Sequence, residues 1–182
     1  MSIPVKILLV SGSIRADSTN GALVRTAHQL RVEGVATTVC TGMADLPHFN
    51  PDDDRAPLPA AVEHVRRQIG AADAILFSTP EYAGSLPGSF KNLLDWSVGG
   101  GEIYQKPVGW VNISGAPTGA RGAYETLAVV LGYVGAIIIP TACLHAPLAR
   151  SEVGADGLIT SVPVQQLVAQ ALDEMRRAVQ AT

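Results

Sequence analysis

The chain has 182 residues, a length that fits one domain with an apolar core of its own. Hydrophobic residues make up 47% and charged residues 16%, which excludes a disordered chain and is usual for an α/β protein with buried parallel strands. A net charge of −3, with no basic cluster longer than two adjacent arginines, argues against nucleic-acid and membrane partners.

The N-terminal sequence MSIPVKILLV is predicted to be a strand. Its apolar run is too short for a membrane span and leads into Ser11 rather than a signal-peptide cleavage site. Cys40 and Cys143 lie near the ends of apolar runs without the spacing of metal ligands, so we expect reduced packing residues. Together these patterns favour a cytoplasmic protein.

Apolar strands and amphipathic helices alternate along the chain. Strands are predicted at Val5–Val10, Val35–Cys40, Ala74–Ser78, Val108–Ile113 and Ala136–Pro140. Helices are predicted at Gly21–Arg31, Leu58–Ile69, Ser89–Trp96, Gly122–Leu131 and Val164–Val179. This alternation predicts a single α/β domain over residues 1–182, with a parallel sheet and helices on both faces. In such sheets ligands bind beyond the carboxyl ends of the strands.

The loop after the first strand, Ser11–Asn20, is typical of a phosphate-binding segment. Its residues are small, it carries several hydroxyl groups and one cation, Arg15, and it leads into a helix N-terminus, where backbone N–H groups are free. An ordinary polar loop that caps the following helix would have a similar composition.

Two further loops follow neighbouring strands. Thr79–Gly88 offers backbone polar groups to the edge of a heterocycle and Tyr82 to a ring face, although a Pro/Gly turn before a helix is the alternative. Ser114–Gly122 consists of small residues that let a flat ligand touch the backbone, or it only forms a helix entry. The three loops together favour a nucleotide-like ligand.

Several other motifs are absent or weak. The sequence lacks a P-loop, a GxGxxG fingerprint and a GxSxG elbow, and no cysteine opens the anion loop. The run Asp52–Asp54 is interpreted as a solvated loop rather than a metal site. The pair Arg66–Arg67 is interpreted as a solvated helix face, and Asp95 is expected to pair locally. His48 and His145 lie in loops near the expected ligand face.

The residues Gly12–Arg15 with Ser18 and Asn20, then Thr79–Tyr82, Leu86–Gly88, Lys91–Asn92 and Asp95–Trp96, resemble the NADPH-dependent FMN reductase family. That family includes flavodoxin-like quinone, azo-compound and chromate reductases. The resemblance covers roughly residues 6–130. It implies a flavodoxin-like three-layer sandwich with a five-stranded parallel sheet of order 2-1-3-4-5, bound FMN, and a homodimer or homotetramer.

The resemblance also implies residue roles. Phosphate ligands would be Ser13, Arg15, Ser18, Thr19 and Asn20. Residues around the isoalloxazine would be Pro80, Glu81, Tyr82, Ala83 and Gly84, with Ser114 and Gly115 at its other edge or the ribityl chain. Family members commonly carry Asn where this chain has Ala83, so a side-chain hydrogen bond there is lost.

The function implied is transfer of electrons from NADPH or NADH through FMN to a quinone-like acceptor, another small acceptor or free flavin. The flavin would carry the chemistry, so no catalytic side chain and no metal ligand is assigned. Two alternatives remain: an electron carrier that does not use nicotinamide, disfavoured weakly by a pI near 5.7, and a regulatory domain without flavin. The apolar segment Leu86–Val98 is expected to be exposed and to contribute to a subunit interface.

Overall fold

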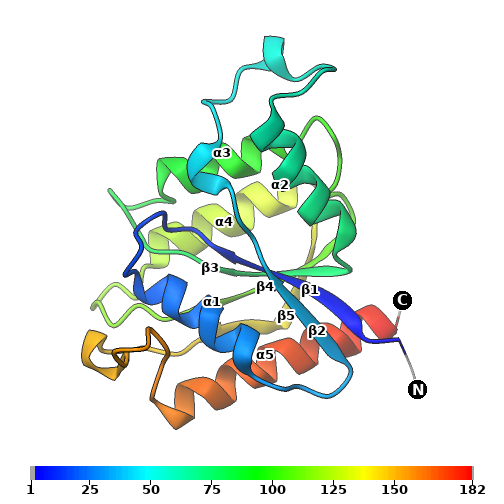
Figure 1. Cartoon of the computed structure of the whole chain (residues 1–182). Coiled ribbons are helices and arrows are strands. Elements are labelled where there is room, and N and C mark those ends of the chain that lie inside the picture. Colours follow the sequence, from blue (N-terminus) through cyan, green and yellow to red (C-terminus); the bar gives the residue numbers. More distant parts are fainter. Residues whose placement is uncertain (1–2, 182) are drawn as a thin grey trace.

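The computed structural model describes residues 3–181 and shows a three-layer α/β sandwich (Figure 1). Its strands are β1 (Val5–Ser11), β2 (Val35–Val39), β3 (Ala74–Ser78), β4 (Pro107–Asn112) and β5 (Ile137–His145). Its α-helices are α1 (Thr19–Gln29), α2 (Ala60–Ala71), α3 (Gly88–Trp96), α4 (Arg121–Tyr133) and α5 (Val162–Gln180). Three short 3-10 helices are η1 (Met43–Asp45), η2 (Pro51–Asp53) and η3 (Arg150–Glu152).

The strands form one parallel sheet of order β2-β1-β3-β4-β5, which confirms the expected flavodoxin-like topology. The chain leaves β1 toward one edge, to β2, and then crosses back to β3 on the other side of β1. The strand order therefore reverses between β1 and β3. In open α/β sheets, the crevice beyond the carboxyl ends of the strands at this reversal is where ligands bind.

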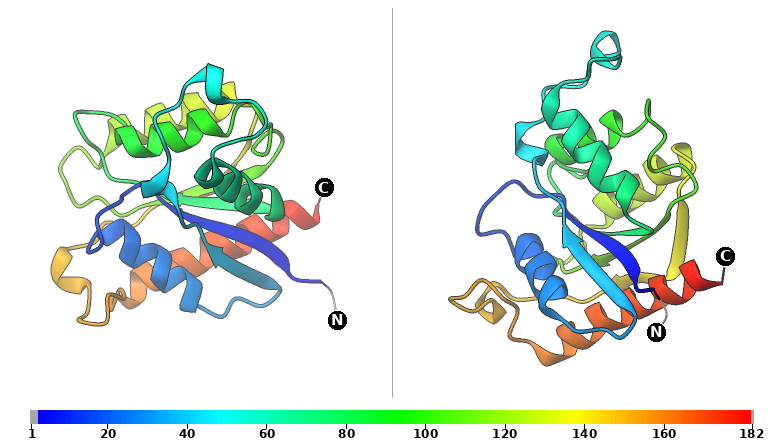
Figure 2. Two further views of the ribbon diagram at one scale, coloured as in Figure 1. Left: turned by 45° about the horizontal axis from the view of Figure 1, so that its top comes forward. Right: turned by 45° about the vertical axis from the view of Figure 1, so that its right-hand side comes forward.

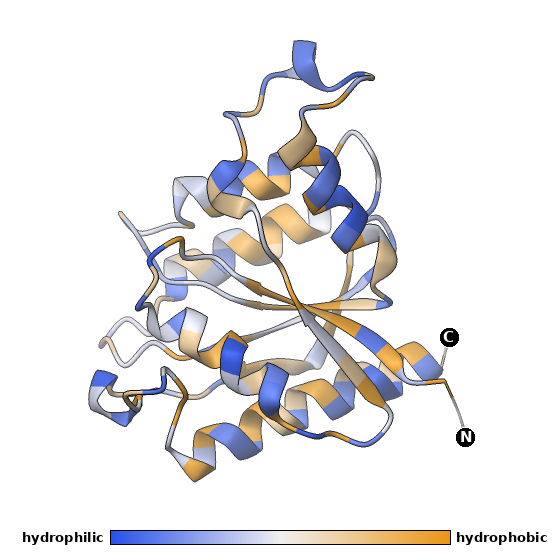
Figure 3. Ribbon diagram, viewed as in Figure 1, coloured by the Kyte–Doolittle hydropathy of each residue, from blue (hydrophilic) through white to orange (hydrophobic). Residues whose placement is uncertain are grey.

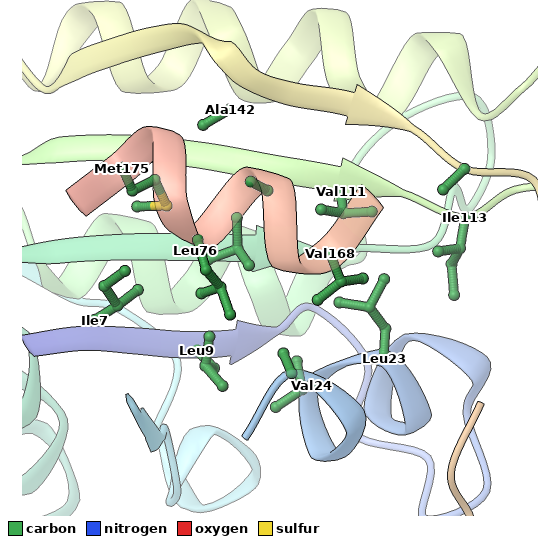
Figure 4. Packing of buried hydrophobic residues seen from close by; sticks show 14 of the residues in the cluster. Ile7, Leu9, Leu23, Val24, Leu76, Val111, Ile113, Ala142, Val168 and Met175 are labelled. Carbon is green, nitrogen blue, oxygen red and sulfur yellow. The ribbon is translucent and has the colours of Figure 1, made fainter. Parts of the chain in front are cut away.

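The strands are apolar on both sides because each side is covered by helices, as Figure 2 shows from two directions. Alternate residues of β1 enter different cores. Ile7 and Leu9 pack with α1 and α5, whereas Leu8 and Val10 pack with α2, α3 and α4. Figure 4 shows the first core, where Leu23 and Met175 reach the sheet from α1 and α5.

The helices are amphipathic, and Figure 3 shows hydrophobic ribbon concentrated in the strands and along the helices beside the sheet. Among the described residues, no helix has the length and apolarity needed to cross a membrane. The predicted elements are confirmed, with ends displaced by one or two residues except at β5.

Strand β5 is longer than predicted and runs to His145 rather than ending at Pro140. After a bulge in the pairing between Val108 and Trp110, Cys143 and His145 continue the ladder opposite Trp110 and Asn112. A proline interrupts a central strand but is tolerated on an edge strand, and β5 is an edge. His145 therefore lies at a strand end rather than in a loop.

The expected exposure of Leu86–Val98 is wrong for most of the segment. Phe90, Leu93 and Leu94 of α3 are buried in the second core, and Trp96 is 1% exposed. Trp96 stacks edge-on against Phe49 at a centroid distance of 5.0 Å and donates its indole N–H to the Pro47 carbonyl at 2.8 Å. The loop after β2 covers Trp96, and the core of the fold encloses the other three side chains, which leaves all four unavailable to a second subunit.

The interpretation of Arg66–Arg67 as a solvated face is right for Arg67 and wrong for Arg66. The Arg66 side chain is 8% exposed, donates Nε to the Trp96 carbonyl at 2.6 Å and pairs with Asp54 at 2.7 Å. The acidic run is correspondingly divided, since Asp54 is partly buried while its two neighbours are exposed. No cluster of His, Cys, Asp or Glu suited to a metal ion occurs within residues 3–181.

Candidate functional site

A cavity of about 430 Å³ lies beyond the carboxyl ends of the strands, where the strand order reverses. We call it the central cavity. It is lined by Thr19, Asn20, Thr79, Pro80, Glu81, Ile113, Ser114, Gly115, Ala116, Thr118, Ala120, Leu148 and Arg150. The three loops singled out in the sequence therefore meet at one site, and its volume falls in the usual range for small-molecule pockets.

A larger hollow of about 750 Å³ lies elsewhere, between the end of α1 and the edge strand β2. It is lined by residues from His28 to Thr37, at the amino end of the strand. This position is opposite to the end at which open α/β sheets bind ligands. The central cavity is therefore the better candidate site despite its smaller volume.

The predicted site residues divide into those that line the central cavity and those that do not. The lining set contains Thr19, Asn20, Pro80, Glu81, Ser114 and Gly115. The other predicted residues belong to the first two of the three loops but do not line the cavity: Ser13, Arg15, Ser18, Tyr82, Ala83 and Gly84. The lining residues given no ligand role from the sequence include Thr79 and Thr118, which lie in the predicted loops, and Leu148 and Arg150. The last two belong to the chain after β5, where no motif marked them.

The loop after β1 leads into α1, and some of its polar groups already form hydrogen bonds within the loop and with the helix. The Ser18 hydroxyl, buried at the N-cap, accepts the Gly21 N–H at 2.8 Å. The N–H groups of Thr19 and Asn20, in the first turn of α1, lack partners within the helix. Ser13 accepts the Arg15 N–H at 3.3 Å, and the Arg15 side chain is exposed. The loop thus combines a helix cap with free donors, so the two interpretations of its sequence are compatible.

Asn20 is the most constrained donor of the site. Its side chain is buried, and its Oδ1 accepts the Ser78 hydroxyl at 2.8 Å, at the end of β3. Asn20 lines the central cavity, and its amide nitrogen Nδ2 makes no hydrogen bond within residues 3–181, so it remains available as a donor. A buried asparagine fixed in this way presents a preoriented donor to a polar ligand.

Close backbone packing joins the first two loops at Gly12. Its N–H donates to the Ser78 carbonyl at 2.8 Å, and a Cβ at this position would lie 2.3 Å from the Thr79 hydroxyl oxygen. Only glycine fits this contact without displacing β3 or the loop that follows it. Gly12 therefore serves the packing of two loops against each other.

The second loop forms a tight hairpin whose tip is Ala83–Gly84. Tyr82 and Ser85 exchange both backbone hydrogen bonds, at 3.0 and 3.1 Å. Ala83 and Gly84 have φ of 51° and 73°, as a two-residue turn of this kind requires. Asparagine tolerates this left-handed region far better than alanine. The asparagine that the family resemblance implies at this position would thus have a backbone reason, beyond the side-chain hydrogen bond that Ala83 lacks.

Glu81 holds the second loop against the third. Its Oε2 accepts the Ala123 N–H at 3.1 Å in the first turn of α4, whose N-cap residue Ala120 has no capping side chain. Gly122 lies beneath this contact, and a Cβ there would meet the Gly84 carbonyl oxygen at 2.2 Å. The carboxylate of Glu81 is therefore committed to a helix N-terminus, where its negative charge is favourable.

The third loop is braced by the ends of β4 and β5. Asn112 accepts the Ser114 N–H at 2.9 Å and donates to the Gly119 carbonyl, while Nε2 of His145 lies 3.0 Å from the Ser114 carbonyl oxygen. The hydroxyl of Tyr124 in α4 accepts the Thr79 N–H and donates to the Thr79 carbonyl, at 3.2 Å in each case. Burial raises the pKa of the Tyr124 phenol to about 12, so it stays neutral at physiological pH.

This arrangement defines a class of protein: a flavodoxin-like fold with a preformed cavity at the topological switch point, lined by small residues and backbone donors. The model of the NADPH-dependent FMN reductase family matches residues 5–151. The chain belongs to that family.

The chain is 41% identical over 97 residues to an NAD(P)H-dependent FMN reductase of Pseudomonas aeruginosa, covering 53% of this chain and 52% of that protein. It is 34% identical over 97 residues to a quinone reductase of Escherichia coli K12, again covering 53% and 52%. The chain thus spans about half the length of these curated relatives.

Among solved structures, the flavoenzyme NAD(P)H:(acceptor) oxidoreductase FerB of Paracoccus denitrificans superposes with a TM-score of 0.84 and 27% identity. The match covers 97% of this chain and 98% of FerB. A flavodoxin of Pseudomonas aeruginosa superposes with a TM-score of 0.57 at 19% identity, over 93% of this chain and 99% of the flavodoxin, a likeness of fold.

Proposed function

We propose that this protein is an FMN-dependent NAD(P)H oxidoreductase that passes electrons from a nicotinamide through bound FMN to a quinone-like or other small acceptor, or to free flavin. The observation that carries the proposal is the convergence of three loops, after β1, β3 and β4, on one cavity at the strand-order reversal. Membership of the FMN reductase family and the likeness to FerB support it.

The residues present fit FMN. The cavity combines preoriented donors, small residues that let a flat ring touch the backbone, and a volume typical of small-molecule sites. In this proposal Ser13, Arg15, Ser18, Thr19 and Asn20 hold the phosphate. Pro80, Glu81, Tyr82, Ala83 and Gly84 border the isoalloxazine. Ser114 and Gly115 hold its other edge or the ribityl chain.

Bound FMN supplies the redox chemistry, accepting hydride equivalents from a nicotinamide and delivering electrons to the acceptor. The chain's own residues bind and orient. Free N–H groups of Thr19 and Asn20 meet negative charge at the α1 N-terminus. Glu81 fixes the hairpin that borders the ring by capping α4. Because that carboxylate is committed, and it is the one acid among the described residues that line the cavity, no side-chain proton transfer is assigned.

The proposed partners are a nicotinamide dinucleotide and a small-molecule acceptor. The proposed oligomeric state is a homodimer or homotetramer, and the proposed location is the cytoplasm. Since the core of Leu86–Val98 is buried, another surface must form the interface. Val129 and Tyr133 on the outer side of α4 are 62% and 92% exposed and offer apolar area for it. Residues 1–182 are proposed to act as one FMN-binding domain, as the single continuous sheet supports.

An absorbance spectrum of the purified protein, followed by anaerobic addition of NADPH, tests the function. We expect flavin bands that bleach on mixing and recover when a quinone is added. A yellow protein that NADPH and NADH both leave oxidised would instead be an electron carrier. A preparation that binds no flavin would overturn the proposal.

A further inference from the structure

The segment between β5 and α5, residues 146–161, folds onto α1 rather than forming a free loop. The Ile159 N–H donates to the Thr26 hydroxyl at 2.9 Å, and Nε of Arg25 donates to the Gly157 carbonyl at 3.2 Å. Figures 1 and 2 show this gold and orange segment beside α1 in every view. The segment is thereby attached to the helix whose N-terminus forms part of the candidate site.

The segment is also braced internally, around the short helix η3. Oε2 of Glu152 accepts the Ala149 N–H at 2.8 Å, and the Glu152 carbonyl accepts both the N–H and the hydroxyl of Thr160, at 2.8 and 2.9 Å. Val153 and Ile159 form an isolated antiparallel bridge. Arg150, the first residue of η3, therefore projects from a structured support.

Arg150 stands between two cavities. It lines the central cavity and a second one of about 210 Å³, which we call the rim cavity. The rim cavity is lined by Asp17, Ser18, Thr19, Arg25, Arg150, Val153, Gly154, Ala155 and Gly157. Thr19 is the other residue that lines both. The two cavities thus adjoin along Thr19 and Arg150, at the end of the site next to the loop after β1.

The charges around the rim cavity favour an anion. Its lining residues carry two guanidinium groups, of Arg25 and Arg150, and one carboxylate, that of Asp17. Within residues 3–181 the Arg150 guanidinium has neither an ion pair nor a side-chain hydrogen bond, whereas Glu152 has its carboxylate committed to Ala149. The lining of the rim cavity thus carries one net positive charge in a protein whose net charge is −3. A planar guanidinium donates two parallel hydrogen bonds to a phosphate group.

We propose that Arg150 and Arg25 form a phosphate-monoester subsite on the rim of the central cavity, supplied by a part of the chain that carries no recognised motif. Arg150 donates to the phosphate, and Arg25 adds positive charge while fixing the segment through Gly157. Two phosphate monoesters could use it: the 5′-phosphate of FMN and the 2′-phosphate of NADPH. This inference rests on the proposed function, since that function places both molecules at this cavity.

The decisive variant is Arg150→Gln, because the exposed Arg150 side chain pairs with no residue of 3–181, so its loss should not disturb folding. Apoprotein is titrated with FMN and with riboflavin, and the quenching of flavin fluorescence gives the two affinities. If the subsite holds the FMN phosphate, the variant binds FMN about tenfold more weakly than wild type and binds riboflavin equally well. Arg150→Lys, which keeps the charge but not the paired donors, should recover part of the loss.

The second arm measures KM for NADPH and for NADH in the flavin-loaded protein. If the subsite holds the 2′-phosphate, Arg150→Gln raises KM for NADPH about tenfold and leaves that for NADH unchanged. Arg67→Gln is the matched control, because it removes an exposed arginine of α2 that lines neither cavity.

The subsite is supported if Arg150→Gln weakens binding of FMN but not of riboflavin, or raises KM for NADPH but not for NADH. Equal changes for both partners, or none in both arms, overturn it. Failure of the subsite is distinct from failure of the proposed function. Wild type that binds FMN and is reduced by NADPH, beside an Arg150→Gln variant that behaves identically, rejects only the subsite. Wild type that binds no flavin rejects both.

Discussion

Ala83 shows how a single residue can meet a backbone requirement at some cost. With φ of 51° it occupies the left-handed region, which its Cβ disfavours by about 1 kcal/mol. The hairpin tip nevertheless holds its shape, because both backbone hydrogen bonds between Tyr82 and Ser85 are made. Ala83 does not line the central cavity, so a substitution that relieves the backbone strain leaves that lining unchanged.

Ala83→Gly is therefore expected to raise the free energy of unfolding by about 0.5 to 1 kcal/mol, after the greater freedom of glycine in the unfolded chain is subtracted. Ala83→Asn should act in the same direction. Urea unfolding measures the change. Ala169→Gly, inside α5, is the control of opposite sign, with a loss of about 1 kcal/mol. Destabilisation by Ala83→Gly would mean that the turn does not have this conformation in solution.

At the scale of elements, helix α4 depends on a residue far away in the chain for its cap. The Ala120 side chain has no acceptor to offer, and Glu81, in the loop after β3, accepts the Ala123 N–H at 3.1 Å. The same contact fixes the hairpin relative to the third loop. One carboxylate therefore links helix stability to the geometry of the cavity.

We expect Glu81→Ala to lower the free energy of unfolding by about 1 to 2 kcal/mol, the usual cost of removing a helix cap. Glu81→Gln, which keeps an acceptor but loses the charge, should cost about 0.5 kcal/mol. Glu125→Gln on the exposed side of α4 is the control, with a change below about 0.5 kcal/mol. If Glu81→Ala unfolds at the same urea concentration as Glu125→Gln, the capping role is wrong.

A second connection between elements is the buried ion pair that ties the loop after β2 to α2 and α3. Arg66 binds Asp54 and the Trp96 carbonyl, and Oε2 of Glu102, buried without a hydrogen-bond partner, lies 3.8 Å from its Nε. Gly99 fits closely here, since a Cβ would meet the Asp54 carboxylate at 1.9 Å.

Arg66→Met is predicted to destabilise the protein by about 3 to 5 kcal/mol, because it leaves the Asp54 carboxylate and the Trp96 carbonyl without their donor and the Glu102 carboxylate without a neighbouring positive charge. Arg67→Met, on the exposed side of the same helix, should change the free energy of unfolding by less than about 0.5 kcal/mol. Thermal and urea unfolding of the two variants give the comparison. Equal stabilities would show that the buried pair contributes nothing net.

At the scale of the whole molecule, burial of titratable groups makes stability depend on alkaline pH. Desolvation raises the pKa of the Tyr124 phenol from its ordinary 10.0 to about 12, and it raises the pKa of the Cys40 thiol to about 12. The folded state holds these protons at pH values where the unfolded chain releases them. Stability is therefore complete below the ordinary pKa values and falls as the pH rises through the folded ones.

For Tyr124 this loss is expected between pH 10 and pH 12 and amounts to about 2 to 3 kcal/mol. Urea unfolding of wild type and of Tyr124→Phe across this range measures it. The difference in free energy of unfolding between wild type and Tyr124→Phe should shrink with rising pH, because phenylalanine has no proton to lose. The cysteine thiols are present in both proteins and do not contribute to this difference. Curves that stay parallel to pH 12 would contradict the burial of an un-ionised phenol.

The sequence by itself determined the architecture and the location of the site. Short apolar runs such as Ala74–Ser78 that alternate with helical periods are typical of buried parallel strands, and the loops after parallel strands gather at one edge. The positions of Asn20 and Pro80 at the cavity followed from that rule. The twelve proposed flavin contacts remain predictions.

Only the tertiary structure decided contacts between residues distant in the chain. The burial of Arg66 and Trp96 depends on the covering loop after β2, and the role of Glu81 depends on a helix that begins forty positions later. Arg150 had no motif to mark it, because its place at the cavity results from the docking of residues 146–161 onto α1. Such contacts leave no local periodicity, since the energy that forms them comes from packing across the fold.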